Sequence, residues 1–93
     1  MRIDKTAVGR RLKAIRSAVG IERKEFLGRL GIGIADWNGY EDARMLLAPL
    51  SAAKVCEQVP GLTLDWIYLG RTSGLDPDLH RKLAAAEAGG KAA

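Results

Sequence analysis

Apolar residues recur along this chain at intervals of three and four positions, the spacing that places side chains on one face of an α-helix. The first such segment predicts a helix over residues 5–19. Its inward stripe comprises Ala7, Val8, Leu12, Ile15 and Val19. Asp4 is suited to cap the N-terminus because its carboxylate accepts hydrogen bonds from free amides, and Gly20 is suited to end the helix.

Two shorter helices are predicted next, over residues 23–30 and 34–42. Glu22 is placed to cap the first of them. In the first of them Phe26, Leu27 and Leu30 face inward, and in the second Ile34, Trp37 and Tyr40 or Glu41 recur at helical steps. The connection Gly31-Ile32-Gly33 leaves room only for a tight turn. Two helices of about eight residues joined by a turn that contains glycine have the geometry of a helix-turn-helix.

Proline and glycine divide the remaining chain into further predicted helices. Pro49 opens a helix to about residue 59, because proline suits the first helical turn. Its predicted inner face comprises Leu50, Ala53, Cys56 and Val59. Thr63 is placed to cap a short helix over residues 64–69 that ends at Gly70. In that helix Trp66, Ile67 and Leu69 are expected to pack inward.

A last helix is predicted after a linker over residues 71–75. Asp76 and Pro77 begin it, and Gly89-Gly90 is expected to stop it near residue 88. Its apolar stripe is thin and comprises Leu79, Leu83 and Ala86. A free helix of about twelve residues is marginal in water, so this one should pack on its own domain or on a partner chain. The final residues, GGKAA, are expected to be disordered.

Composition narrows the class of protein. The chain has 93 residues, 47% of them hydrophobic and only 5% aromatic, which favours one all-helical domain. The single thiol of Cys56 cannot form an intramolecular disulfide, and a cytoplasmic location is the simplest expectation. No apolar run is long enough to span a membrane, and the N-terminal residues lack the apolar stretch of a signal peptide.

The positive charge is concentrated at the N-terminal end. Residues 1–30 contain nine basic and three acidic side chains, a net charge of +6, whereas the rest of the chain carries −2. Arg10, Arg11, Lys13 and Arg16 fall mostly off the apolar stripe of the first helix and are expected to face water or a ligand. Such a split predicts a surface for a polyanion. The alternative is a solvated basic helix face.

The segment from Gly20 to Arg44 resembles the DNA-binding domain of the lambda-repressor-like family, which includes Cro proteins and the xenobiotic-response-element regulators. Twelve residues fall on the positions of the family pattern without a gap: Gly20, Ile21, Glu22, Arg23, Phe26, Leu27, Leu30, Gly31, Ile32, Trp37, Tyr40 and Glu41. The later segment TLDWIYLG, residues 63–70, is similar to the closing helix of the same family. Leu27 departs from the pattern, because the family prefers alanine there.

The resemblance implies an all-α, five-helix domain over residues 1–70, followed by a C-terminal extension over residues 71–93 that holds the linker, the last helix and the disordered end. It implies a transcriptional regulator, expected to be a repressor of phage or mobile-element origin, that binds double-stranded DNA as a homodimer. Either the last helix or the region 66–69 is the expected dimer surface. We expect no enzymatic activity, no cofactor and no small-molecule substrate.

The third predicted helix would lie in the major groove, with its N-terminal residues at the base edges. The positions expected to meet bases are Gly33, Ile34, Ala35, Asp36 and Asn38. Asn38 can pair with adenine and Asp36 can accept from cytosine, while the others offer at most contact with a thymine methyl. The expected phosphate contacts are Arg10, Arg11, Arg23, Lys24 and Gly39. Arg23 replaces the glutamine with which the family usually contacts phosphate.

None of the expected groove-facing residues is arginine, lysine or glutamine. This favours a second hypothesis, a protein-interaction module whose degenerate recognition helix binds another regulator. The apolar run IGIAD, residues 32–36, is the sequence feature behind it. His80 lies near Asp76 and Asp78, but an exposed histidine beside a helix cap explains that spacing without a catalytic role.

Overall fold

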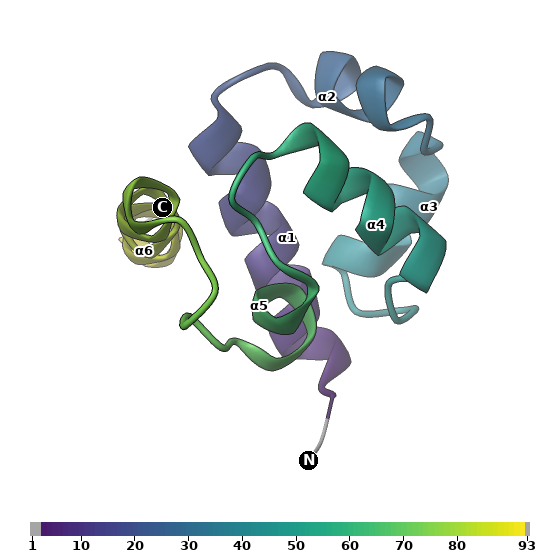
Figure 1. Cartoon of the computed structure of the whole chain (residues 1–93). Helices are drawn as coiled ribbons and strands as arrows, with labels where there is room; N and C mark the ends of the chain where they lie inside the picture. Colours follow the sequence, from purple (N-terminus) through teal and green to yellow (C-terminus); the bar gives the residue numbers. More distant parts are fainter. Residues whose placement is uncertain (1–2, 93) are drawn as a thin grey trace.

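The computed structural model describes residues 3–92, with side chains up to Ala88. These residues form an all-helical domain without strands, with a radius of gyration of 12.1 Å. The helices are α1 (Lys5–Val19), α2 (Arg23–Leu30), α3 (Ile34–Glu41), α4 (Pro49–Gln58), α5 (Leu64–Leu69) and α6 (Pro77–Ala92). In Figure 1, α1 crosses the middle of the molecule, and it contacts α3, α5 and α6. The predicted all-α class and order of helices are confirmed.

Two predicted N-terminal caps are present, and a third lies at the predicted start of the last helix. The Asp4 carboxylate accepts the Thr6 amide at 3.1 Å, and the Thr63 hydroxyl accepts the Trp66 amide at 3.1 Å. Asp76 caps α6 in the same way through a side-chain oxygen. Each cap satisfies an amide that the helix itself leaves without an acceptor. The N-terminal bounds of these helices were therefore predictable from local chemistry.

The turn between α2 and α3 is the predicted three residues. Gly31 has a φ of 68°, a left-handed conformation that allows the chain to reverse direction immediately after α2. The amides of Gly31 and Ile32 then bond back to Gly28 and Leu27. The predicted role of Glu22 is wrong in one respect: it occupies the N-cap position of α2, but its side chain makes no capping hydrogen bond among the described residues.

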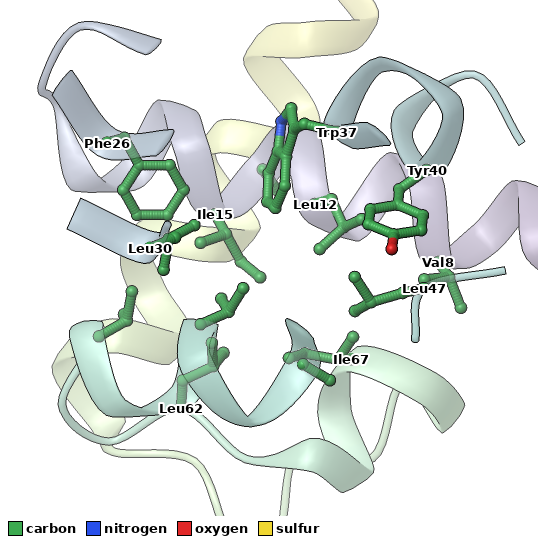
Figure 2. Close-up of a cluster of buried hydrophobic side chains, with 14 of the residues drawn as sticks. Val8, Leu12, Ile15, Phe26, Leu30, Trp37, Tyr40, Leu47, Leu62 and Ile67 are labelled. Atoms are coloured by element: carbon green, nitrogen blue, oxygen red, sulfur yellow. The ribbon is translucent and has the colours of Figure 1, made fainter. Parts of the chain in front are cut away.

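The core is built around the inner face of α1. Leu12 and Ile15 are completely buried and lie beside Trp37 and Phe26 (Figure 2). The two aromatic rings meet edge to face, with centroids 5.8 Å apart and planes at 85°. Such a pair stabilises the core by roughly 0.5–1.5 kcal/mol beyond its burial. This contact joins α2 to α3, so the relative placement of the two short helices is fixed from the core side.

The predicted inner face of α4 is wrong. The buried residues are Ala52, Val55 and Val59, whereas Leu50 is 70% exposed and Ala53 and Cys56 are only partly buried. The two stripes share Val59 and differ otherwise by a rotation of about 100°, or one helical position. Leu47, just before the helix, is buried, and its carbonyl accepts the Tyr68 hydroxyl at 2.7 Å. This hydrogen bond joins α5 to the residues just before α4, and it occurs together with the difference between the predicted and the observed buried face of α4.

The C-terminal helix α6 packs on its own domain. This is one of the two predicted arrangements, the other being packing on a partner chain. Leu83 is buried and Leu79 and Ala86 are partly buried against the core that α1 helps to build. Leu75, in the predicted linker, is buried as well. The predicted stop at Gly89-Gly90 is wrong because α6 continues to Ala92.

Glycine in a helix interior costs only about 1 kcal/mol relative to alanine, and it keeps its backbone hydrogen bond. Two glycines are therefore compatible with a continuing helix. Ala93, the last residue of the predicted disordered end, lies outside the described residues. Within the described part of the chain, none of the helices combines the length and the apolar character needed to cross a membrane.

Candidate nucleic-acid interface

The first turn of α3 is open to solvent. Gly33, Ile34, Ala35 and Asp36 are all exposed, and Ile34 has 58% of its surface accessible. The predicted accessibility of these four positions is therefore confirmed. Their chemistry is sparse, because only Asp36 carries a polar side chain. Asn38, one turn further along, is partly buried.

Gly39 is not a surface position. It is buried, and a Cβ placed on it would lie 2.7 Å from the Cε atom of Met45. Its carbonyl accepts the amides of Arg44 at 2.9 Å and Met45 at 3.2 Å, which turns the chain back over the end of α3. The expectation that Gly39 contacts phosphate is corrected because the segment after α3 covers it.

That covering segment turns through an alanine in an unusual conformation. Ala43 has a φ of 62°, and its amide bonds to the Tyr40 carbonyl. A residue with a Cβ is disfavoured in this left-handed region by roughly 1–2 kcal/mol. The turn leads into Met45 and Leu46, both of which are exposed. Sequence reasoning assigned no role to this segment.

The other end of α3 is held against α1 by a buried carboxylate. Glu41 is 7% exposed and accepts hydrogen bonds from Arg16, through Nε at 2.9 Å and Nη2 at 3.2 Å. The Trp37 indole also donates to Glu41. The expectation that Arg16 faces water or a ligand is therefore corrected, because two of its donors are engaged inside the protein. The sequence signal was an acidic residue on the inward face of α3, which needs a cation when buried.

Helix α1 approaches α3 closely at Gly9. A Cβ there would lie 2.5 Å from the Glu41 carbonyl oxygen and 3.0 Å from that of Tyr40. Because backbone atoms cannot swing aside as a flexible side chain can, only glycine fits without moving a helix. The position was not identified from the sequence, where Gly9 lies within an ordinary helical pattern.

The four predicted basic phosphate contacts have different environments. Lys24 is exposed and Arg23 is partly buried at the start of α2; within the described structure, the Nε atom of Arg23 is buried without a hydrogen-bond partner. Arg10 is exposed on α1. Arg11 instead donates from Nη1 to the Ile67 carbonyl at 3.0 Å.

Arg11 thus contributes to the fold at the end of α5, and the expectation that it faces water or a ligand is corrected. A cation near the end of a helix interacts favourably with its unpaired carbonyls. Burial lowers the pKa of Arg11, with a smaller opposing contribution from the Glu87 charge. Three of the four basic candidates therefore remain available at the surface, at least in part.

Trp37 and Tyr40 are buried, as their predicted packing role requires (Figure 2). His80 is exposed. Cys56 is partly buried, and burial raises the pKa of its thiol. Across residues 3–92, His, Cys, Asp and Glu side chains form no group of three or more suited to a metal ion.

Comparison with known proteins finds no matching family model, no matching curated protein and no matching solved structure.

Proposed function

We propose that this chain is a DNA-binding transcriptional regulator with a lambda-repressor-like helix-turn-helix formed by α2 and α3. The observation that carries the proposal is the asymmetry of α3. Its first turn is exposed directly after a three-residue turn, while its last turn is fixed to α1 through Glu41 and Arg16. A helix held in this way presents its N-terminal end to a partner, which is the arrangement that major-groove recognition uses.

Affinity in this proposal comes from the start of α2. Arg23 and Lys24 lie there, and helix N-termini favour anions through their free amides and dipole. Arg10 is an additional candidate for phosphate contact because it is exposed. Arg11 and Gly39 are no longer proposed as DNA contacts, since both are engaged within the protein.

Base readout rests on few side chains. Asn38 is the one residue of the set that can both donate and accept, while Asp36 only accepts and its charge opposes phosphate. Ile34, Ala35 and Gly33 add at most apolar contacts. One bidentate contact contributes roughly 1–3 kcal/mol of discrimination, whereas specific binding typically exceeds non-specific binding by about 4–10 kcal/mol. We therefore include a homodimer and DNA-shape recognition in the proposal.

Binding of the full chain to mixed genomic DNA fragments at low salt tests the proposal. A gel shift that is titratable and is suppressed by added salt is the expected result. Enrichment of particular fragments from the mixture would then supply the operator. Failure to bind any fragment at low salt would overturn the proposal.

A second candidate function is a protein-interaction module that uses the same helices. It is favoured by the exposed apolar residues on and after α3, which are Ile34, Met45, Leu46 and Leu50. Where such side chains form a contiguous patch they are typical of protein contacts, and apolar groups contribute little to DNA phosphate binding. An absence of DNA binding in the gel shift would leave this second function as the better account.

A further inference from the structure

A crevice of about 360 Å³ lies between α1 and α6, away from the start of α3. It is lined by Arg10, Lys13, Ala14, Arg16 and Ser17 from α1 and by Ala86 and Glu87 from α6. Its volume is near the lower end of the range of about 300–1,000 Å³ that is typical of small-molecule sites. The crevice therefore suits a compact ligand.

Small side chains make room for this crevice. Ala14 is buried and Ala86 is partly buried, so each contributes a methyl group where a longer side chain would fill the space between the helices. The aliphatic stems of Arg10 and Lys13 add apolar surface at the walls. A ligand with a small apolar group would find complementary surface here.

The charges at the crevice favour an anion. Arg10, Lys13 and Ser17 lie at helical spacings of three and four, which places them on one face of α1. Both cations are exposed, and no described side chain forms an ion pair with either. The Ser17 hydroxyl can donate a further hydrogen bond.

Two other charged residues limit this preference. Arg16 has two of its donors engaged by Glu41, so it forms a fixed wall and adds little free charge. Glu87 lies on the opposite side, where its carboxylate opposes a bound anion. Two available cations against one carboxylate leave a net positive site.

We infer that this crevice binds a small organic anion, a carboxylate or phosphate ester that carries a compact apolar group. Arg10 and Lys13 bind the charged group, and Ala14 and Ala86 contact the apolar group. The site is distinct from the exposed turn of α3, and the inference does not depend on DNA binding.

Only the Arg16 side chain would separate a ligand in this crevice from α3. Arg16 lines the crevice and donates to Glu41, which in turn accepts the Trp37 indole N–H. The Trp37 indole resonance therefore reports on the crevice. Trp66, which does not line it, serves as the internal reference.

The test is a nitrogen-15 NMR titration of the full chain with phenyl phosphate at constant ionic strength, without DNA. Saturable shifts are expected at the amides of Ala14, Ser17 and Ala86 and at the Trp37 indole. Benzyl alcohol, a neutral compound of similar size, should bind at least about tenfold more weakly because it cannot accept charge-assisted hydrogen bonds. Shifts that grow linearly over the whole basic surface would overturn the inference.

Variants supply the second arm of this test. Arg10→Ala with Lys13→Ala should abolish the saturable shifts, whereas Arg44→Ala with Lys54→Ala, which removes the same charges elsewhere, should not. Glu87→Gln should strengthen phenyl phosphate binding several-fold, because it removes the opposing charge. Weaker binding to Glu87→Gln, or unchanged binding to the Arg10 and Lys13 variant, would contradict an anion site.

Because these titrations contain no DNA, their failure would leave the proposed DNA-binding function untouched. The gel shift of the wild-type chain decides that function separately. Each comparison requires a folded variant, shown by wild-type amide resonances for the residues of α2, none of which lines the crevice.

Discussion

The two ends of α3 differ in almost every physical property. The C-terminal end is buried and held by Glu41, which accepts hydrogen bonds from Arg16 and Trp37, and it packs against α1 at Gly9. The N-terminal end is exposed, and its accessible side chains include Ile34 and Asp36. The difference shows that a helix can be positioned firmly through one end while the other remains available to a partner.

The largest effect is expected from removing the carboxylate at the buried end. Glu41→Ala should lower the free energy of unfolding by about 2–4 kcal/mol, because it leaves Arg16 and the Trp37 indole without their acceptor. The expected loss is smaller than the largest values for broken buried ion pairs, because the Arg16 side chain is 31% exposed and water can partly solvate it. Chemical denaturation with tryptophan fluorescence measures it.

The matched control is Glu25→Ala. Glu25 forms an exposed ion pair with Arg29 within α2, and such pairs contribute only about 0.3–0.5 kcal/mol. Equal destabilisation by the two substitutions would show that the Glu41 contacts have no special role in holding α3.

The next largest effect is expected at the contact between helices. Gly9→Ala should destabilise the protein by about 1–3 kcal/mol, since the new methyl group would overlap the Glu41 carbonyl unless α1 and α3 separate. Gly28→Ala in α2 meets no atom within 4 Å and should stabilise by about 0.5–1 kcal/mol. Thermal melts compare the two, and a neutral Gly9→Ala would contradict the close packing.

One turn beyond the open end of α3, Asn38→Ala should reduce the ratio of specific to non-specific DNA affinity by about 1–3 kcal/mol, equivalent to several-fold or more. Non-specific affinity should stay nearly unchanged, because the substitution leaves the phosphate contacts in place. Paired titrations of the selected operator and a random duplex at one salt concentration measure the ratio. A variant that retains its full preference would show that Asn38 does not contact bases.

The smallest effect is expected at the exposed apolar residues. Leu50→Ala should change the free energy of unfolding by less than about 0.5 kcal/mol, because Leu50 is largely exposed. Val55→Ala, on the buried face of the same helix, should cost about 1–3 kcal/mol. If denaturant unfolding showed a larger loss of stability for Leu50→Ala than for Val55→Ala, the buried face of α4 would be the one that the sequence pattern predicted.

Local chemistry explains which parts of the fold could be predicted from the sequence. The N-terminal ends of α1 and α5 can be predicted from Asp4 and Thr63, because each cap accepts an amide only two or three positions away. The face of α4 could not be chosen, since two apolar stripes fit it equally and only contact with the rest of the core distinguishes them. Helix periodicity does not contain that information.

The candidate site divides in the same way. The exposure of residues 33–36 follows from a turn that the chain itself encodes. The engagement of Arg16 depends on Glu41, 25 residues away, and that of Arg11 depends on Ile67, 56 residues away. The net charge of the N-terminal segment therefore overstated the charge available to a ligand, because two of its arginines stabilise the fold.

The central claim is that the start of α2 and α3 binds DNA, and the salt dependence of binding tests it most directly. Arg23→Ala with Lys24→Ala should weaken binding to every duplex and reduce the slope of log affinity against log salt by about one to two, since each neutralised phosphate accounts for about 0.9 of that slope. Arg81→Ala with Lys82→Ala, which removes the same pair of charges from α6, should leave the slope unchanged. Equal slopes and equal affinities for the two double variants would contradict the account.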